Sequence, residues 1–399
     1  MERTMQQLKS MKAAPLDVKV LLTKQRIREW VNEFGTDGVY VSFSGGKDST
    51  VLLDIVRSVY PSIPAGFSDT GLEYPEIRDF VRTFENVEWV KPEMSFKQVI
   101  EQYGYPFISK EVSQTVDEAR KYLTSIKGKT KDIDGQDNNV PNDNAIADLY
   151  GIDRRNDKNN PDLLEVKRGV IPKKYKYGKP YCVLQLEGKA PHKEKGVLTG
   201  EFSKVYDKSR YRFILDAPFC VSSKCCYVTK KKPMNEYAKQ SNRQPITAQM
   251  AVESMLRTSN WMKYGCNAFD SKMPISNPMS FWTEQDVLYY IKKNKLPLCS
   301  VYGDIVEVGE IKGQMNIADF EGVGEYVPQL TTTGMKRTGC MFCGYGCHLE
   351  KPGEGRFELM KKTHPKQYEW IMKDWDAGGL GYKRVIDWLN ENGNLHIRY

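Results

Sequence analysis

The residues best suited to chemistry form a short glycine-containing loop near the start of the chain. This loop reads Ser44-Gly45-Gly46-Lys47-Asp48-Ser49, after an apolar stretch and before a helical pattern. Two glycines let the backbone turn tightly, so that its N–H groups and the dipole of the next helix face an anion. Lys47 can neutralise phosphate oxygens, Asp48 can bind the Mg²⁺ that accompanies a triphosphate, and both serines can donate hydrogen bonds. The loop predicts phosphate binding, with a plain glycine turn as the alternative.

A second polar stretch, Ser68-Asp69-Thr70-Gly71-Leu72-Glu73, follows the next apolar strand pattern. Open parallel sheets bind ligands at the carboxyl ends of their strands, and this stretch begins at such an end. We therefore expect Asp69 and Glu73 to orient a ribose, Mg²⁺ or the reacting group, with Thr70 and Gly71 in the turn between them. The alternative is a helix-entry turn whose acids lie near a positive helix dipole.

Four of the nine cysteines form two tight groups, the adjacent pair Cys225-Cys226 and the sequence Cys340-Met-Phe-Cys343. Thiolates are soft ligands that suit iron–sulfur clusters and zinc. Cys220, Cys347 and His348 lie nearby in the sequence and could alter the ligand set. A metal site is thus expected, with zinc as the alternative metal.

Basic side chains near these cysteines could contact a sulfate or phosphate group. Arg257 suits such an anion because its guanidinium binds in a bidentate manner. Lys224 and the lysines at 230–232 are further candidates, although a solvated surface explains them equally well. A basic run at 167–179 with two tyrosines could grip a nucleic-acid backbone, but an exposed loop is the favoured interpretation.

The elements that must position these residues alternate between helix and strand. Helical periodicity covers residues 18–34, 47–59 and 74–84, and apolar strand patterns cover 38–43, 63–67 and 87–90. This order predicts an α/β fold with a parallel sheet and helices on both faces. Further helices are expected at 245–263, at 283–293 after the N-cap Thr283, and in the aromatic-rich C-terminal part. We divide the chain into a first core segment at 1–123, a polar and basic insertion at 124–200, a cysteine-bearing remainder at 201–348 and a helical extension at 349–399.

The composition and charge of the chain limit which partners and which cell compartment we expect. The chain has 399 residues and a formal net charge of +8, which favours anionic partners without separating a nucleotide from a nucleic acid. No apolar stretch approaches the roughly 18 residues of a membrane span, and the first residues are polar. We therefore expect a cytoplasmic protein with no membrane partner.

The motifs together resemble those of the phosphoadenosine-phosphosulfate reductase family. The glycine loop resembles that of the PP-loop ATP pyrophosphatases, which split ATP into AMP and pyrophosphate, and the Asp69-Thr70-Gly71 segment resembles the branch that handles sulfonucleotides. The four cysteines resemble the [4Fe–4S] site of adenylylsulfate reductases. The DNA phosphorothioation sulfur-transfer proteins belong to the same branch. The resemblance implies an adenine nucleotide as ligand, Mg²⁺ with ATP, and catalytic roles for Lys47, Asp48 and Asp69.

One feature of the reductases has no counterpart here. They use a cysteine in a C-terminal Glu-Cys-Gly-x-His setting, whereas this sequence has no cysteine after Cys347. The leading hypothesis is therefore an ATP pyrophosphatase that adenylates an acceptor, coupled to sulfur transfer through a cluster, with nucleic acid or a sulfur-donor protein as possible partners. The alternatives are a sulfonucleotide reductase whose nucleophile is Cys220 or Cys347, and a non-catalytic module that binds a nucleotide or a nucleic acid.

Overall fold

The computed structural model describes residues 3–126, 180–194, 197–308 and 328–399. The chain forms two compact units, unit 1 from residues 1–96 and 226–341 and unit 2 from residues 97–225 and 342–399. These units cut across the four segments expected from the sequence, whose boundaries stay a prediction. The basic run at 167–179, with its two tyrosines, lies outside the described residues, as does most of the expected insertion.

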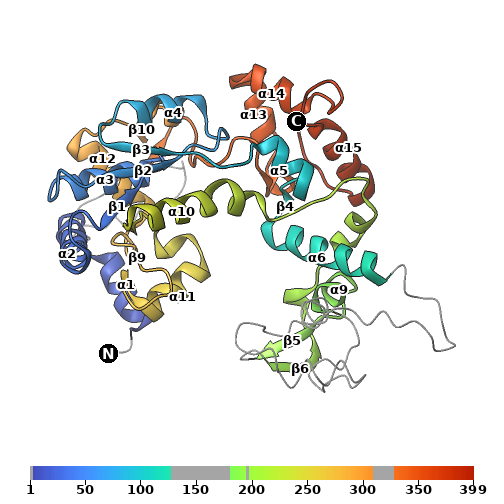
Figure 1. Cartoon of the computed structure of the whole chain (residues 1–399), viewed down its shortest axis with the longest axis horizontal. Helices are drawn as coiled ribbons and strands as arrows, with labels where there is room; N and C mark the ends of the chain where they lie inside the picture. The colour runs from blue at the N-terminus through green and yellow to red at the C-terminus, as the bar shows by residue number, and fades with distance from the viewer. Residues whose placement is uncertain (1–2, 127–179, 195–196, 309–327) are drawn as a thin grey trace, which may run out of the picture. The chain divides into compact units, whose positions relative to one another are not determined.

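Unit 1 contains the predicted nucleotide-binding elements (Figure 1). Its helices are α1 (Met5–Ala13), α2 (Leu16–Phe34), α3 (Lys47–Arg57), α4 (Pro75–Arg82), α10 (Lys232–Ser241), α11 (Met255–Tyr264) and α12 (Glu284–Asn294), with the short turns η4 (Tyr227–Lys231), η5 (Ala251–Glu253) and η6 (Ser300–Tyr302). Its strands are β1 (Val39–Ser42), β2 (Ala65–Ser68), β3 (Val87–Val90), β7 (Gln244–Ile246), β8 (Asn267–Ala268), β9 (Ile275–Ser276), β10 (Ile305–Glu307) and β11 (Leu330–Thr332).

Six of these strands form one sheet in the order β3-β2-β1-β7-β9-β8. Every neighbouring pair is parallel except β8 with β9. In the centre, Val41 of β1 is paired with Ala65 of β2 on one side and Ile246 of β7 on the other. The predicted α/β fold with a mostly parallel sheet is confirmed.

Helices cover both faces of this sheet because side chains alternate along β1. The ring of Tyr40 packs edge-on against Tyr237 of α10, with 5.0 Å between the centroids. Phe43, at the end of β1 and on the opposite face, packs at 5.0 Å against Phe84, which follows α4. Helices on both faces therefore bury β1, the strand that leads into the glycine loop.

Local sequence explains where the flanking helices begin and end. Thr283 caps α12 through a capping box with Asp286, whose N–H donates to the Thr283 hydroxyl while its carboxylate accepts from the Thr283 N–H at 2.7 Å. α12 ends at Asn294, and the capping residue Lys295 adopts the left-handed conformation. The predicted N-cap and the helices at 18–34, 47–59 and 74–84 are confirmed within a few residues.

The predicted helix over 245–263 is wrong in its first half. Residues 244–246 form β7, paired with β1, and the helix α11 begins only at Met255, after the N-cap Ser254. The apolar residues Ile246, Met250 and Ala251 fit a helical spacing, but pairing with a central strand decides the conformation.

Unit 2 contains α5 (Phe96–Tyr103), whose first residue closes the first segment of unit 1, and a set of helices with short strand pairs. The helices are α6 (Lys110–Ile126), α9 (Tyr181–Leu186), η2 (Lys204–Tyr206), η3 (Ser209–Asp216), η8 (Cys347–Leu349), α13 (Arg356–Thr363), α14 (Pro365–Met372) and α15 (Tyr382–Gly393). The strands are β4 (Phe107–Ile108) with β12 (Gly344–Tyr345), and β5 (Pro191–Glu194) with β6 (Val197–Phe202). The fully buried Tyr382 packs against Phe107 at 5.1 Å and donates to the Phe342 carbonyl at 2.7 Å. Within the described residues, every helix is too short or too polar to span a lipid bilayer.

Candidate functional site

The glycine loop joins β1 to α3 and closes on itself through hydrogen bonds. The Ser44 N–H donates to the Ser49 hydroxyl at 3.2 Å, and that hydroxyl donates to the Gly46 carbonyl at 2.9 Å. Gly45 has φ +70°, and a Cβ there would lie 2.8 Å from a methyl group of Val81. Only glycine satisfies both conditions, so the loop brings its backbone to the start of α3 as an anion site requires.

Lys47, the first residue of α3, is buried, and its ammonium is held by two groups from distant parts of unit 1. It lies 3.0 Å from a carboxylate oxygen of Glu284 at the start of α12. It also donates to the backbone carbonyl of Lys336 at 2.9 Å. A cation is therefore fixed beside the loop, at the place where phosphate charge is expected.

Asp48 follows Lys47 in the chain, and we call Lys47, Asp48 and Glu284 the charged group beside the loop. The Oδ1 atom of Asp48 is buried and has no hydrogen-bond partner. Burial raises the pKa of Asp48; the charge of Lys47 opposes this shift and that of Glu284 adds to it, while Arg337 and Arg257 favour the charged form. A buried carboxylate oxygen without a partner fits a divalent cation, and the surrounding cations fit the phosphates that such an ion accompanies.

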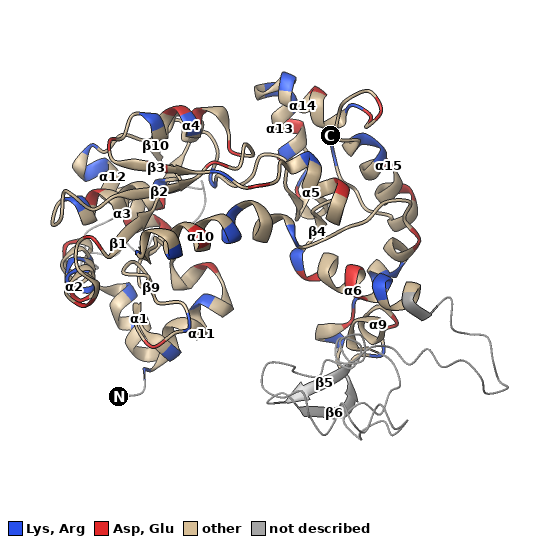
Figure 2. Ribbon diagram, viewed as in Figure 1, with Lys and Arg blue, Asp and Glu red and all other residues tan. Residues whose placement is uncertain are grey.

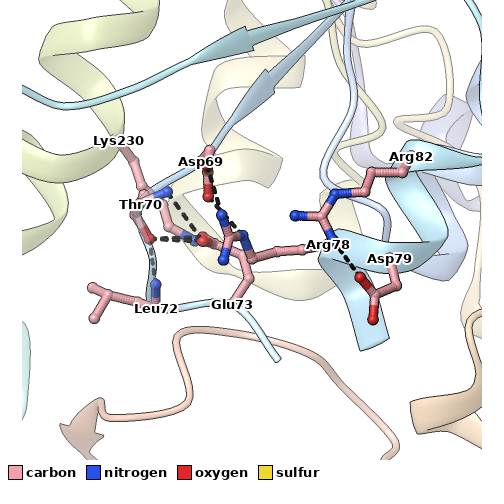
Figure 3. A network of polar contacts seen from close by, with 8 residues as sticks. All are labelled: Asp69, Thr70, Leu72, Glu73, Arg78, Asp79, Arg82 and Lys230. Atoms are coloured by element: carbon pink, nitrogen blue, oxygen red, sulfur yellow. Dashed lines mark hydrogen bonds and ion pairs between the residues drawn. The ribbon is translucent and has the colours of Figure 1, made fainter. Parts of the chain in front are cut away.

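The turn after β2 forms a compact network with α4 and η4 (Figure 3). Arg78 binds both carboxylate oxygens of the buried Asp69, at 3.0 and 3.1 Å. The Thr70 hydroxyl donates to the Glu73 carboxylate at 2.8 Å, and the ammonium of Lys230 lies 3.3 Å from that carboxylate. Gly71, with φ +73°, lets the chain turn between them.

A pocket of about 330 Å³ opens at the carboxyl ends of β1, β2 and β7, within the size range of ligand sites. Of the residues predicted for the nucleotide, Ser44 and Glu73 line it; Lys230 and Lys231 line it from η4, and Thr338 and Gly339 from the segment before Cys340. Lys47 and Asp48 are not among its lining residues and form the adjoining charged group. Figure 2 shows the basic residues that gather at the start of α10.

Arg257 lies in the first turn of α11, where its N–H donates to the Ser254 hydroxyl. Its guanidinium contacts the Glu253 carboxylate, and burial and the charge of Arg337 lower its pKa. The charge of Arg257 lowers the pKa of Asp48, but Arg257 does not line the pocket beside Ser44. Its role in binding an anion stays a prediction.

The four predicted metal ligands divide between the units, Cys226 and Cys340 in unit 1 and Cys225 and Cys343 in unit 2. All nine cysteines are thiols without disulfide bonds. Among the described residues, no group of three or more His, Cys, Asp or Glu side chains is placed to hold a metal ion. The four-cysteine site therefore stays a prediction.

Cys340 has a cationic neighbour within unit 1. The Lys230 ammonium hydrogen-bonds to the Cys340 sulfur as well as to Glu73. Burial lowers the pKa of Lys230, but the charges of Cys340 and Glu73 outweigh burial and raise that pKa overall. Such a cation favours the thiolate, which is the form that binds a metal.

The other cysteines of unit 2 differ in exposure. Cys220 is exposed, and Arg120 lies 3.5 Å from its sulfur. Cys347 is buried and donates to the Gly344 carbonyl at 2.8 Å, and burial raises its pKa to about 12. His348 shares a hydrogen bond with the Tyr211 hydroxyl at 3.3 Å.

Several residues of the site are not evident from the sequence. From the sequence alone, Glu284 is expected to face solvent at the start of a helix. Arg78 is expected to be one of many surface cations. Thr338 carries no motif of its own, whereas Arg337 belongs to a basic pair close to Cys340 that could have been noticed. Contacts between segments distant in sequence bring Glu284, Arg337 and Thr338 to the loop. Arg78 instead reaches Asp69 from the neighbouring helix α4.

Comparisons with known proteins assign this chain to a family. The comparison with curated proteins gives no match. Among solved structures, the phosphoadenylyl-sulfate (PAPS) reductase from Candida auris in its phosphate complex is 12% identical, over 75% of this chain and 91% of that chain, with a TM-score of 0.32. The family model of the phosphoadenosine phosphosulfate reductase domain matches residues 38–136 and 180–344, which is more than half of the chain and includes the loop, the acidic turn and all four predicted cysteine ligands. The chain therefore belongs to the phosphoadenosine phosphosulfate reductase domain family.

Proposed function

We propose that this chain is an enzyme that cleaves ATP between its α- and β-phosphates and adenylates an acceptor. The family assignment supports a nucleotide-related activity. The observation that carries the more specific proposal is the charged group beside the loop, in which the unpartnered Asp48 oxygen lies among cations. A nucleotide without a triphosphate has less need of both a buried carboxylate for Mg²⁺ and several cations.

The contacts around the loop support the following proposed roles. The loop N–H groups and Lys47 would hold the phosphates, and Asp48 would hold Mg²⁺, which neutralises phosphate charge. The nucleoside would occupy the pocket beside Ser44 and Glu73. In the reaction, an acceptor oxygen attacks the α-phosphorus, the bond to the bridging oxygen breaks, and that oxygen leaves with pyrophosphate.

Cys225, Cys226, Cys340 and Cys343 are proposed to bind a [4Fe–4S] cluster, with zinc as the alternative. The thiol donor set and the Lys230 cation at Cys340 fit such a group. A bound cluster would supply redox or sulfur-transfer chemistry. Absorbance in the visible region, with iron and zinc analysis of anaerobically purified protein, tests this assignment, because zinc-loaded protein would be colourless.

A sulfonucleotide reductase is the second candidate, and the family of the matched domain favours it. This reaction needs a thiolate nucleophile. Cys347 is poorly suited because it is buried and its pKa is raised to about 12. Cys220 is the better candidate, since it is exposed and lies beside Arg120.

Two product assays separate these functions. Anaerobic protein with MgATP and candidate acceptors, including nucleic acid and sulfur-donor proteins, should release pyrophosphate. Protein with a sulfonucleotide and a dithiol should release sulfite only if it is a reductase. Lys47→Ala should lower pyrophosphate release at least about hundredfold, as loss of a charge-stabilising group does. Lys239→Ala, on the outer end of α10, is the control; absence of pyrophosphate with every acceptor tried would contradict the proposal.

A further inference from the structure

The hydroxyl group of Tyr302 reaches the first N–H of α3. Tyr302 is 2% exposed, and its hydroxyl accepts a hydrogen bond from the Lys47 backbone N–H at 3.2 Å. This N–H belongs to the set that an anion at the start of the helix would use. A protein hydroxyl thus occupies a position that the proposed phosphate site needs.

Thr338 extends this hydroxyl to the pocket. Its hydroxyl shares a hydrogen bond of 2.7 Å with that of Tyr302, and Thr338 lines the pocket together with Ser44. Both hydroxyls lie against the loop, because a Cβ on Gly46 would be 3.2 Å from the Tyr302 oxygen and 3.3 Å from the Thr338 oxygen. Thr338 is the outer member of the pair and Tyr302 the inner one.

Backbone hydrogen bonds fix the pair in place. The Gly334 N–H donates to the Tyr302 carbonyl at 2.8 Å, and the Met335 N–H donates to the Val301 carbonyl at 2.9 Å. Gly303 turns the chain after Tyr302 with φ +64°. The segment that carries Thr338 is therefore tied to the segment that carries Tyr302.

We propose that Thr338 is a phosphate-binding residue and that Tyr302 positions it. A hydroxyl both donates and accepts, so the pair can satisfy the Lys47 N–H without ligand and then turn a donor towards a bound anion. When a nucleotide phosphate oxygen accepts the hydrogen bond from the Lys47 N–H, the Thr338 hydroxyl donates to the same phosphate group. The Tyr302 hydroxyl keeps its hydrogen bond to Thr338 and so holds the threonine in place. This inference rests on the proposed function of the loop as a nucleotide-phosphate site.

Calorimetric binding of MgATP and of adenosine 5′-phosphosulfate tests the proposal with four proteins: the unaltered chain, Thr338→Val, Thr338→Ser and Tyr302→Phe. Thr338→Val should weaken binding about tenfold or more, since it removes a hydrogen bond to a charged group. Thr338→Ser keeps the hydroxyl and should bind within about threefold of the unaltered chain. Tyr302→Phe should weaken binding by less than Thr338→Val, because the threonine hydroxyl remains.

The outcomes separate the inference from the proposed function. Equal binding by Thr338→Val, or equal weakening by Thr338→Ser and Thr338→Val, would overturn the inference while the nucleotide site stands. A lack of binding of both nucleotides by the unaltered chain would overturn both. Comparing MgATP with adenosine 5′-phosphosulfate shows whether the Thr338 hydroxyl binds a triphosphate or a phosphosulfate. Thermal melting confirms that each variant is folded.

Discussion

The ammonium of Lys47 and a carboxylate oxygen of Glu284 are 3.0 Å apart, although 237 positions separate the two residues along the chain by their numbering. Glu284 thus neutralises the charge of Lys47 beside the glycine loop. Its side chain is 45% exposed and that of Lys47 is 4% exposed, so solvent screens one partner only. Binding of phosphate must compete with this carboxylate for the ammonium.

Glu284→Gln should therefore strengthen the binding of metal-free ATP. Removing one negative charge from a partly exposed pair corresponds to roughly a two- to fivefold gain in affinity, which shrinks as salt is raised. Calorimetry in a chelating buffer at low and high salt measures the effect. Glu307→Gln removes a charge from the exposed pair with Lys292 and serves as the control. Weaker binding by Glu284→Gln would mean that the carboxylate helps the ligand.

Arg78→Gln should lower the free energy of unfolding by about 1–3 kcal/mol, because it leaves the buried Asp69 carboxylate without its cation. Urea denaturation measures the change. Arg82→Gln, one turn further along α4, removes an exposed ion pair with Asp79 and should cost less than about 1 kcal/mol. Equal losses for the two variants would show that burial of Asp69 is unimportant.

The affinity for Mg²⁺ in the presence of ATP should fall as the pH is lowered, starting above the range of an ordinary aspartate. Burial raises the pKa of Asp48, so the carboxyl keeps its proton up to a higher pH, and the protonated form does not bind a cation. Titrations with Mg²⁺ at several pH values measure this. Protonation of ATP also makes the Mg²⁺ affinity depend on pH. Asp48→Asn should retain this part of the pH dependence and lose the rest. Glu284→Gln should shift the part due to Asp48 to lower pH, since it removes a charge that raises the pKa of Asp48.

Alkylation of the folded protein should modify Cys220 and spare Cys347 at neutral pH. Cys220 is exposed, whereas Cys347 is buried and burial raises its pKa to about 12, so the reactive thiolate is scarce. Mass spectrometry of peptides after brief iodoacetamide treatment measures both sites. In urea the two cysteines should react alike, and fast labelling of Cys347 without urea would revive it as a candidate nucleophile.

The sequence predicts the loop, the alternating elements and the sheet because these depend on local patterns. Glycines at 45 and 46 and the apolar runs around them suffice to place the glycine loop between β1 and α3. The conformation of 244–254 was not predictable in the same way, since Ile246 and Met250 suit a helix until a central strand pairs with them.

The partners of the loop were beyond sequence reasoning. Glu284 and Tyr302 reach Lys47 and its N–H from positions more than 200 residues away, and Thr338 bonds to Tyr302. Nothing in the local sequence of these three residues indicates a phosphate. The engagement of Asp69 by Arg78 also depends on the orientation of α4, which a pattern of residue types does not specify.

Residues 338–341 touch three features of unit 1 in succession. Thr338 and Gly339 line the pocket, Cys340 accepts a hydrogen bond from Lys230, and the Met341 N–H donates to the Leu72 carbonyl at 2.7 Å. Because these four consecutive residues are all held by contacts, inserting or deleting one residue would displace both the Cys340 thiol and the wall of the pocket. Exchange of side chains within the run is therefore better tolerated than a change of its length.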